Sequence, residues 1–408
     1  MTLSTIIELP KDLPRVLVIT SNLGTLAELR MRNPLRALHR MHIIAGFEVV
    51  DSDLHPLRSD ENRYHIIIIQ RAVPEYIYES FNVRGIPYAL DIDDNMLATP
   101  AYQKDVVYNA IHKGLLGCQV LITPTTRLVH LLERYSGYSL SEKSRLVPNA
   151  LPYPRSFHRK PAQPEQLLWI QSDISALSSS IDDIVRAIDD FSLKYDLPVI
   201  LIGRNVLDRR TLSNQVEMGE IDLTALLQYL SYAPPSIGLA PLETQADEET
   251  MDFIAGKSDM KMLLFTGYGH PGIYSRSPPY EDSPLINTSM LTLNTYSAWL
   301  DALEYQYHSG WKDVCLNSEY IRRERNIERI ACKNLLPALQ SCILSTPMRG
   351  MDIYNTIRKT RRKYIPLILG YNLLLRLGFQ KNDIMSLHNR LKERGKKSQD
   401  NDFELKNN

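Results

Sequence analysis

The sequence has little cysteine, no excess charge of either sign and no long apolar run. Its four cysteines stand far apart without a Cys-x-x-Cys pair, which argues against a disulfide framework or a cysteine zinc site and favours a reducing compartment. The 47 basic and 47 acidic residues cancel, so nucleic acid is not an expected partner. No run reaches the ~20 apolar residues of a membrane-spanning helix, and the first residues lack the pattern of a secretory signal. We therefore expect a cytoplasmic protein.

Several catalytic motifs are also missing. No Gly-x-Gly-x-x-Gly follows the first apolar run and no Gly-x-x-x-x-Gly-Lys-Ser motif occurs anywhere, which excludes a classical dinucleotide dehydrogenase and a P-loop nucleotidase. Neither Gly-x-Ser-x-Gly nor His-Glu-x-x-His occurs, so hydrolase and zinc-peptidase functions have no support. The 408 residues are long enough for two or three domains.

Short β-branched runs closed by turn residues predict two sets of buried parallel strands, with helical spacing between several of them. The first set lies at residues 16–20, 47–50, 66–69, 88–91 and 120–123, with a helix at 34–44. A proline-rich linker follows at 147–164. The second set lies at 167–170, 199–203, 237–242 and 272–275, with helices at 180–194 and 261–268. The pattern predicts an α/β protein with two Rossmann-like doubly wound domains that face a cleft.

The strongest motif precedes the helix at 261–268. It contains Gly256, Lys257, Ser258, Asp259 and Lys261. The start of a helix offers free amide N–H groups and a positive dipole end, and two lysines beside it would suit a diphosphate. The alternative is an ordinary capped surface helix with solvated lysines.

Three ordered segments of the second half resemble the donor domain of GT-B-fold glycosyltransferases, in the broad group of retaining enzymes that includes many bacterial polysaccharide-assembly transferases. They are residues 252–261, the Gly-His-Pro-Gly-Ile-Tyr-Ser segment at 269–275, and residues 291–303 with Asn294, Trp299 and Ala302. Residues 88–95 and 145–150 of the first half are similar to that group as well. The resemblance covers about residues 15–340. It implies a GT-B-like fold with an acceptor domain at 1–160, a donor domain at 161–345, and a basic amphipathic extension at 346–408 with a disordered tail.

The resemblance implies transfer of a sugar from a nucleotide-sugar donor to a saccharide or lipid-linked saccharide in surface polysaccharide assembly, with no metal or other cofactor. It implies that Arg204, Lys257 and Lys261 neutralise the departing nucleotide diphosphate. The donor-binding residues that it implies are Gly203, Gly256, Ser258, Asp259, His270 and Pro271. For Arg204 the alternative is a plain surface arginine, and for His270 it is a structural loop histidine.

The acceptor-side candidates lie at or near the ends of predicted strands in the first half. They are Arg30, Arg32, Arg71, Asp91, Asp93 and Asp94. The arginines are candidates for gripping an acidic or phosphorylated acceptor, and otherwise lie on the solvated surface. An Asp-x-Asp set can hold a divalent cation, but this one stands away from the predicted phosphate loop. We therefore expect either carboxylates that orient or deprotonate a sugar hydroxyl or a turn that caps the strand.

Two departures from the family pattern favour a second interpretation. Leu264 stands where the family usually has a glutamate that holds the donor ribose, and residues 169–173 replace a Gly-rich turn. The alternative function is a catalytically degenerate GT-B protein that serves as a binding or scaffold subunit of a glycosylation complex.

A basic cluster marks the C-terminal extension. Arg358, Lys359 and residues 361–363 precede an apolar stretch that runs to Leu377. Cations beside apolar and aromatic residues are typical of an interfacial anchor, so the stretch from Arg358 to Leu377 predicts peripheral attachment to the inner face of the cytoplasmic membrane. The alternative is a helix pair docked on protein.

Overall fold

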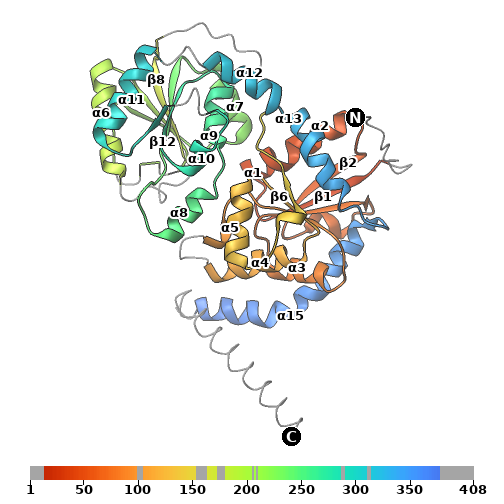
Figure 1. Ribbon diagram of the computed structural model, residues 1–408. Coiled ribbons are helices and arrows are strands. Elements are labelled where there is room, and N and C mark those ends of the chain that lie inside the picture. Colours follow the sequence, from red (N-terminus) through yellow and green to blue (C-terminus); the bar gives the residue numbers. More distant parts are fainter. Residues whose placement is uncertain are drawn as a thin grey trace. The chain divides into compact units, whose positions relative to one another are not determined.

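The computed structural model describes residues 13–98, 104–152, 163–171, 180–204, 206–207, 210–285, 290–309 and 314–376. Two six-stranded parallel sheets organise the chain (Figure 1). The first has the order β2-β1-β4-β5-β6-β7, built from β1 (Arg15–Thr20), β2 (Gly46–Asp51), β4 (Ile66–Gln70), β5 (Ala89–Asp91), β6 (Val120–Thr123) and β7 (Ser144–Leu146). The second has the order β10-β9-β8-β11-β12-β13, built from β8 (Gln166–Ile170), β9 (Val199–Ile202), β10 (Gln215–Gly219), β11 (Ser236–Ala240), β12 (Gly272–Ser275) and β13 (Met290–Thr292).

Both sheets are doubly wound, but their strand orders differ. In each the chain begins at an inner strand, builds outward to one edge, and then returns to build the rest of the sheet. One strand, β2, lies beyond β1 in the first sheet, whereas two, β9 and β10, lie beyond β8 in the second. Ligands of such sheets bind outside the carboxyl ends of the strands where this reversal occurs. The switch points lie between β1 and β4 and between β8 and β11. The predicted fold class is confirmed.

Alternate residues of the first sheet pack on helices. Val16, Val18 and Ile68 share one core with Leu35 and Leu38, which belong to a helix that continues a short π-helical turn. The helices around this sheet are α1 (Thr25–Ala27), the π-helix Glu28–Arg32, α2 (Asn33–Arg40), α3 (Glu75–Asn82), α4 (Lys104–Gly117) and α5 (Thr126–Ser136).

The second sheet has a core on each face. On one face Leu168 and Ile200 pack with α7 (Leu223–Tyr232) and α9 (Met260–Gly267). On the other face Trp169 packs with α6 (Ile181–Tyr195) and with Trp299 of α11 (Tyr296–Ser309). Helices α6 and α9 correspond to the predicted helices at 180–194 and 261–268. The four helices cover both faces of the sheet, as a doubly wound fold requires.

The chain then returns to the first domain. After α12 (Val314–Glu324) come α13 (Ile327–Ile330), the π-helix Ala331–Leu335 and α14 (Leu336–Gln340). Their apolar side chains, Ile330, Leu335 and Leu339 among them, belong to the core of the first sheet. This differs from the expected extent of the donor domain, 161–345, because the apolar face of these helices packs on β1 and β4. Of the expected linker, residues 153–162 lie outside the described part.

The C-terminal part begins with a short antiparallel pair of β14 (Met348–Arg349) with β3 (Arg63–Tyr64). Helix α15 (Gly350–Arg376) follows, and residues from Asn355 onward form a unit of their own. In the part of the chain that the structure describes, no helix has both the length and the apolar character that a membrane crossing needs. Leu377 and the predicted tail lie outside the described residues.

Candidate functional site

The predicted phosphate loop joins two helices of the second domain. Helix α8 (Glu248–Ala255) ends at Gly256, and α9 begins after Asp259, so Lys257 and Ser258 lie between the two helices. Gly256 lies against the loop that follows β5 in the first domain: a Cβ there would be 2.6 Å from the Cβ of Asn95. Asn95 also donates to the carbonyl oxygen of Asp252, 3.4 Å away. The phosphate loop therefore touches the carboxyl end of the first sheet.

Lys261 is a partly buried cation at the start of α9. Its ammonium group donates to Oε1 of Gln171 at 3.4 Å, where β8 ends. Burial, and secondly the positive charge of Lys257, lower the pKa of Lys261 to about 7. No carboxylate pairs with Lys261 among the described side chains. A buried ammonium group without a counter-ion costs free energy, and an anionic ligand would remove that cost.

Lys257 is partly exposed and contacts both domains. Its ammonium group lies 3.6 Å from Oδ1 of Asp94, in the first domain, and 4.2 Å from the ring centroid of Phe253. The side chain keeps 25% of its exposure. A solvent-accessible cation paired with a single carboxylate can exchange that partner for a phosphate group.

The carboxylates at the end of β5 and just after it have two different roles. Asp91 is fully buried and takes a bidentate ion pair from Arg30, with Nη2 2.5 Å and Nε 3.0 Å away. Burial alone would lower the pKa of Arg30, but the adjacent carboxylate outweighs burial and raises it. Neither Arg30 nor Asp91 is therefore available to an acceptor, and their pairing stabilises the end of the sheet.

Asp93 and Asp94 share Arg71, which follows β4 in the left-handed backbone region at φ +60°. Its Nε lies 3.3 Å from Asp93 and its Nη2 lies 3.6 Å from Asp94. Burial, helped by the charge of Asp94 and opposed by Arg71, raises the pKa of Asp93 to about 6. Arg32 lies apart from this set, with its guanidinium bonded to Glu28 and to the carbonyl oxygen of Leu23.

Asn149 joins the two domains through its side chain and backbone. Its Oδ1 accepts from Arg30 at 2.8 Å, and its Nδ2 donates to the Ser258 hydroxyl at 2.7 Å. Its carbonyl oxygen accepts from Nε of Arg325 at 2.8 Å. Ser258, expected to contact the donor, is thus held by the linker of the first domain.

Asp259 is a buried counter-ion rather than an open ligand. Arg325 donates to both of its carboxylate oxygens, at 2.8 and 3.0 Å, and the Ser283 hydroxyl donates at 2.8 Å. Burial raises the pKa of Asp259, but Arg325 and Ser283 outweigh burial, so the net shift is downward. Its position at the start of α9 orients the phosphate loop.

The remaining donor-side candidates are dispersed. Gly203, at φ +138°, passes so close to the strand-end carbonyl of Gln171 that a Cβ would be 1.8 Å from its oxygen. The Arg204 side chain is 76% exposed and pairs with Glu220 at 2.7 Å. The role of Arg204 on the departing diphosphate stays a prediction.

His270 is fully buried, with Nε2 3.0 Å from the carbonyl oxygen of Leu230, and Pro271 is buried beside it. This placement suits packing rather than donor contact.

Leu264 lies where a ribose-binding glutamate was expected. It is buried in the apolar core of the second domain, in a cluster that also contains Leu29 of the first domain and Leu151 of the linker. The side chain has no polar group for a ribose hydroxyl, so ribose recognition in this protein would need other groups.

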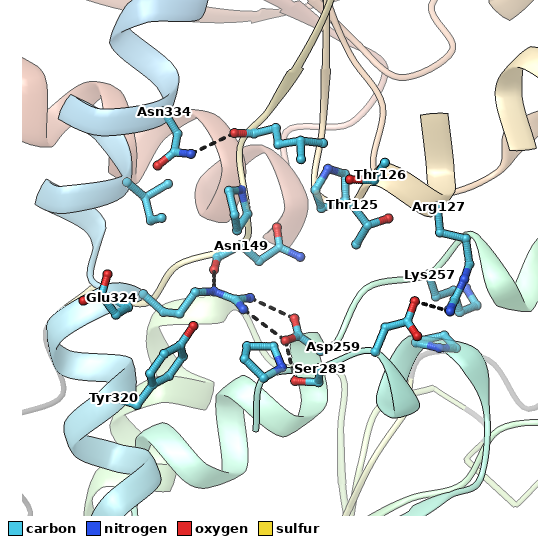
Figure 2. A pocket seen from close by; sticks show the side chains of 18 of the residues that line it. Thr125, Thr126, Arg127, Asn149, Lys257, Asp259, Ser283, Tyr320, Glu324 and Asn334 are labelled. Carbon is cyan, nitrogen blue, oxygen red and sulfur yellow. Dashed lines mark hydrogen bonds and ion pairs between the residues drawn. The ribbon is translucent and has the colours of Figure 1, made fainter. Parts of the chain in front are cut away.

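A cavity of about 490 Å³ adjoins Lys257 (Figure 2). Its wall combines the segments that follow β6 and β7 with helices of the second domain and of the returning segment. The close-up shows Arg127 and Lys257 on one side and Tyr320 and Glu324 on the other, with Asn149 and Asp259 between them. The cations that line the cavity are Arg127, Lys257, Arg325, Arg329 and Lys333, and the carboxylates are Asp259, Asp282 and Glu324. The excess of cations favours an anionic or polar ligand.

Sequence reasoning missed the residues that join the domains. Arg325 stands in a charged run at 322–325, three arginines and a glutamate, that is typical of a solvated helix. Asp252 accepts from the Tyr135 hydroxyl at 2.8 Å and pairs with Arg134, and no local spacing connects residues so far apart.

Among the described residues, no group of three or more histidine, cysteine or acidic side chains could hold a metal ion.

Comparison with known proteins shows the fold. No protein-family model matches the chain, and no curated protein sequence matches it. A glycosyltransferase from Rickettsia africae is similar over 81% of this chain and 99% of that one, at 10% identity and a TM-score of 0.52. A UDP-forming α,α-trehalose-phosphate synthase from Burkholderia xenovorans covers 80% of this chain and 99% of its own, at 12% identity and a TM-score of 0.49. A UDP-N-acetylglucosamine 2-epimerase from Neisseria meningitidis, bound to UDP-N-acetylglucosamine, covers 78% and 95%, at 9% identity and a TM-score of 0.45. The first likeness confirms the GT-B fold, and identity this low says nothing of chemistry.

Proposed function

We propose that this protein is a glycosyltransferase with a nucleotide-sugar donor and a saccharide acceptor, free or lipid-linked, in the assembly of a surface polysaccharide. The observation that supports this proposal is Lys261, a partly buried cation without a carboxylate partner among the described residues, near the second cation Lys257. Two cations at the start of a helix in a doubly wound domain suit the diphosphate of the donor.

The two lysines would act on the leaving group. Transfer breaks the bond between the anomeric carbon and the diphosphate oxygen, and forms a bond from that carbon to an acceptor hydroxyl oxygen. The nucleoside diphosphate departs with added negative charge, which Lys257 and Lys261 would neutralise in place of a metal ion. The acceptor proton leaves with the diphosphate or to solvent. By the resemblance we expect retention of anomeric configuration, which an NMR spectrum of the product would test.

The Lys257 ammonium group is paired with the carboxylate of Asp94. A diphosphate must therefore displace the Asp94 carboxylate before Lys257 can bind it. Arg71, which already lies 3.6 Å from Asp94, would keep that carboxylate as its partner after the exchange. Asp94 thus competes with the donor, and its neutralisation should improve donor binding.

Calorimetric titration with UDP-, GDP- and dTDP-sugars tests the donor site. We expect one nucleotide class to bind, and Lys257→Ala and Lys261→Met each to weaken binding ~10- to 100-fold, as loss of a charge-assisted hydrogen bond predicts. Asp94→Asn should tighten binding by several fold. Lys194→Ala is the matched control, because that lysine lies on α6 and pairs with Glu304.

Two results would contradict the proposal. Absence of binding across the donor panel would favour the scaffold function. Binding that survives both lysine substitutions would place the diphosphate elsewhere. Sugar transfer itself is then measured by release of the nucleoside diphosphate from the donor that binds.

A further inference from the structure

Helix α15 carries a dense group of exposed cations that the proposed reaction does not use. Arg358, Lys359, Arg361, Arg362 and Lys363 fall within six consecutive residues, and all five are exposed. Residues 358, 361 and 362 lie three and four apart, as do 359 and 363, so the cations share one broad side of the helix. We call this group the α15 cationic face.

The same helix also has a covered side. Ile353 and Ile357 are buried and lie four residues apart, on the side away from Arg358 and Arg362. The cations of the α15 cationic face are exposed, in contrast to these two isoleucines. Downstream, the sequence of the helix turns apolar, with Ile365, Leu367 and further leucines up to Arg376.

We infer that the α15 cationic face docks on the surface of a membrane that contains anionic lipids. The charge is complementary to phosphate headgroups, and the cations immediately precede apolar and aromatic residues on one continuous helix, as in helices that lie in a membrane interface. The chain as a whole carries no net charge, so attraction would come from this local face and not from a general affinity for polyanions. The inference concerns attachment and does not depend on the proposed transfer reaction.

Flotation of the full chain with lipid vesicles tests the inference. Vesicles of phosphatidylglycerol and phosphatidylcholine in equal amounts should carry the protein at low salt, and vesicles of phosphatidylcholine alone should not. Binding should fall steeply as salt rises, because screening shortens the reach of charge to about 3 Å at 1 M. Each cation removed should weaken binding on the order of fivefold.

Three variants separate the α15 cationic face from total charge. Replacing its five cations by glutamine should abolish flotation, whereas Arg358→Lys, Arg361→Lys and Arg362→Lys together should preserve it. The matched control should float as the natural protein does. It neutralises five exposed arginines elsewhere in the chain, which are Arg36, Arg40, Arg186, Arg322 and Arg323. Thermal unfolding of each variant shows that the fold is intact.

The inference is overturned if the full chain fails to float with anionic vesicles at low salt, or if the five-glutamine variant floats equally well. Loss of flotation in the lysine variant would also overturn it, since specific arginine contacts of the kind found in protein docking would then be required. A DNA duplex that binds as tightly as the vesicles would show a general polyanion site instead.

Discussion

At the scale of single residues, Lys261 makes the stability of this protein depend on pH. Its pKa is lowered to about 7 in the folded state, against about 10.4 in an unfolded chain. Between these two pH values Lys261 is protonated in the unfolded chain but not in the folded protein, so the free energy of unfolding rises with pH. The destabilisation is complete below about pH 7, where it amounts to ~4 kcal/mol, and is relieved as pH approaches about 10.

Lys261→Met keeps the shape of the side chain and removes its charge. We expect the variant to be more stable than the natural protein by up to ~4 kcal/mol near pH 7, with a difference that shrinks steadily toward pH 10. Urea unfolding over that range measures it, and exposed Lys359→Met should show no such trend. A difference that stays constant with pH would mean that Lys261 is not the titrating group.

The lysine pair could be predicted from its motif, but its surroundings could not. Spacing places Lys257 and Lys261 at the start of a helix, yet nothing local indicates that Asp94 lies beside Lys257. Arg30 and Asp91 were expected to face an acceptor, and they neutralise each other because the order of the strands buries both. Pairings over such sequence separations depend on topology, which local patterns do not contain.

At the scale of secondary structure, the turn from α8 to α9 depends on a glycine for a steric reason. Gly256 has an ordinary helical backbone, with φ −71°, so alanine would not strain it. Its Cβ would however lie 2.6 to 2.7 Å from the Cβ and the backbone nitrogen of Asn95. To remove this clash, the backbone at residue 256 in the second domain and the backbone at Asn95 in the first domain must move apart.

We expect Gly256→Ala to destabilise the protein by ~1–3 kcal/mol, as overpacking does. The control is Gly24→Ala, where the new methyl group meets only the exposed side chain of Asn22. Chemical denaturation measures both. Equal stability of the two variants would show that the contact between Gly256 and Asn95 does not hold in solution.

The buried strands and long helices could be predicted because their apolar pattern is strong, a continuous run in β4 and helical spacing in α6. Strand β10 was missed, since Gln215–Gly219 is a mostly exposed, polar edge strand. The return of residues 327–342 to the first core was missed for another reason. An apolar helix face shows that a helix is covered, but not which sheet covers it.

At the scale of the whole molecule, Arg325 stands where the chain passes back from the second domain to the first. It binds Asp259 at the start of α9 and the carbonyl oxygen of Asn149 in the linker, and is itself buried. The two crossing segments are also bonded through their backbones, since Leu151 donates to the carbonyl oxygen of Arg325 at 3.1 Å. One guanidinium group thus connects the phosphate loop, the linker and the returning helix.

Arg325→Met would leave Asp259 buried without its counter-ion, at an expected cost of ~3–5 kcal/mol near pH 7. In the natural protein the lowered pKa of Asp259 contributes stability that is present above the unfolded pKa of about 3.9 and is lost in acid. In the variant, burial without Arg325 should raise the pKa of Asp259 instead. Asp259 should therefore be protonated, and lose its uncompensated charge, at a higher pH than in the natural protein. The deficit should therefore shrink as pH falls from about 7 toward 4.

Urea unfolding at several pH values would measure this deficit. Arg329→Met is the control, because Arg329 and Glu324 form a half-exposed pair of the kind that contributes at most ~1 kcal/mol. Adding Asp259→Asn to Arg325→Met removes the stranded charge and should recover part of the loss near pH 7. If the double variant were as unstable as the single one at every pH, the uncompensated carboxylate would not be the cause, and the lost bond to Asn149 would carry the coupling between the domains.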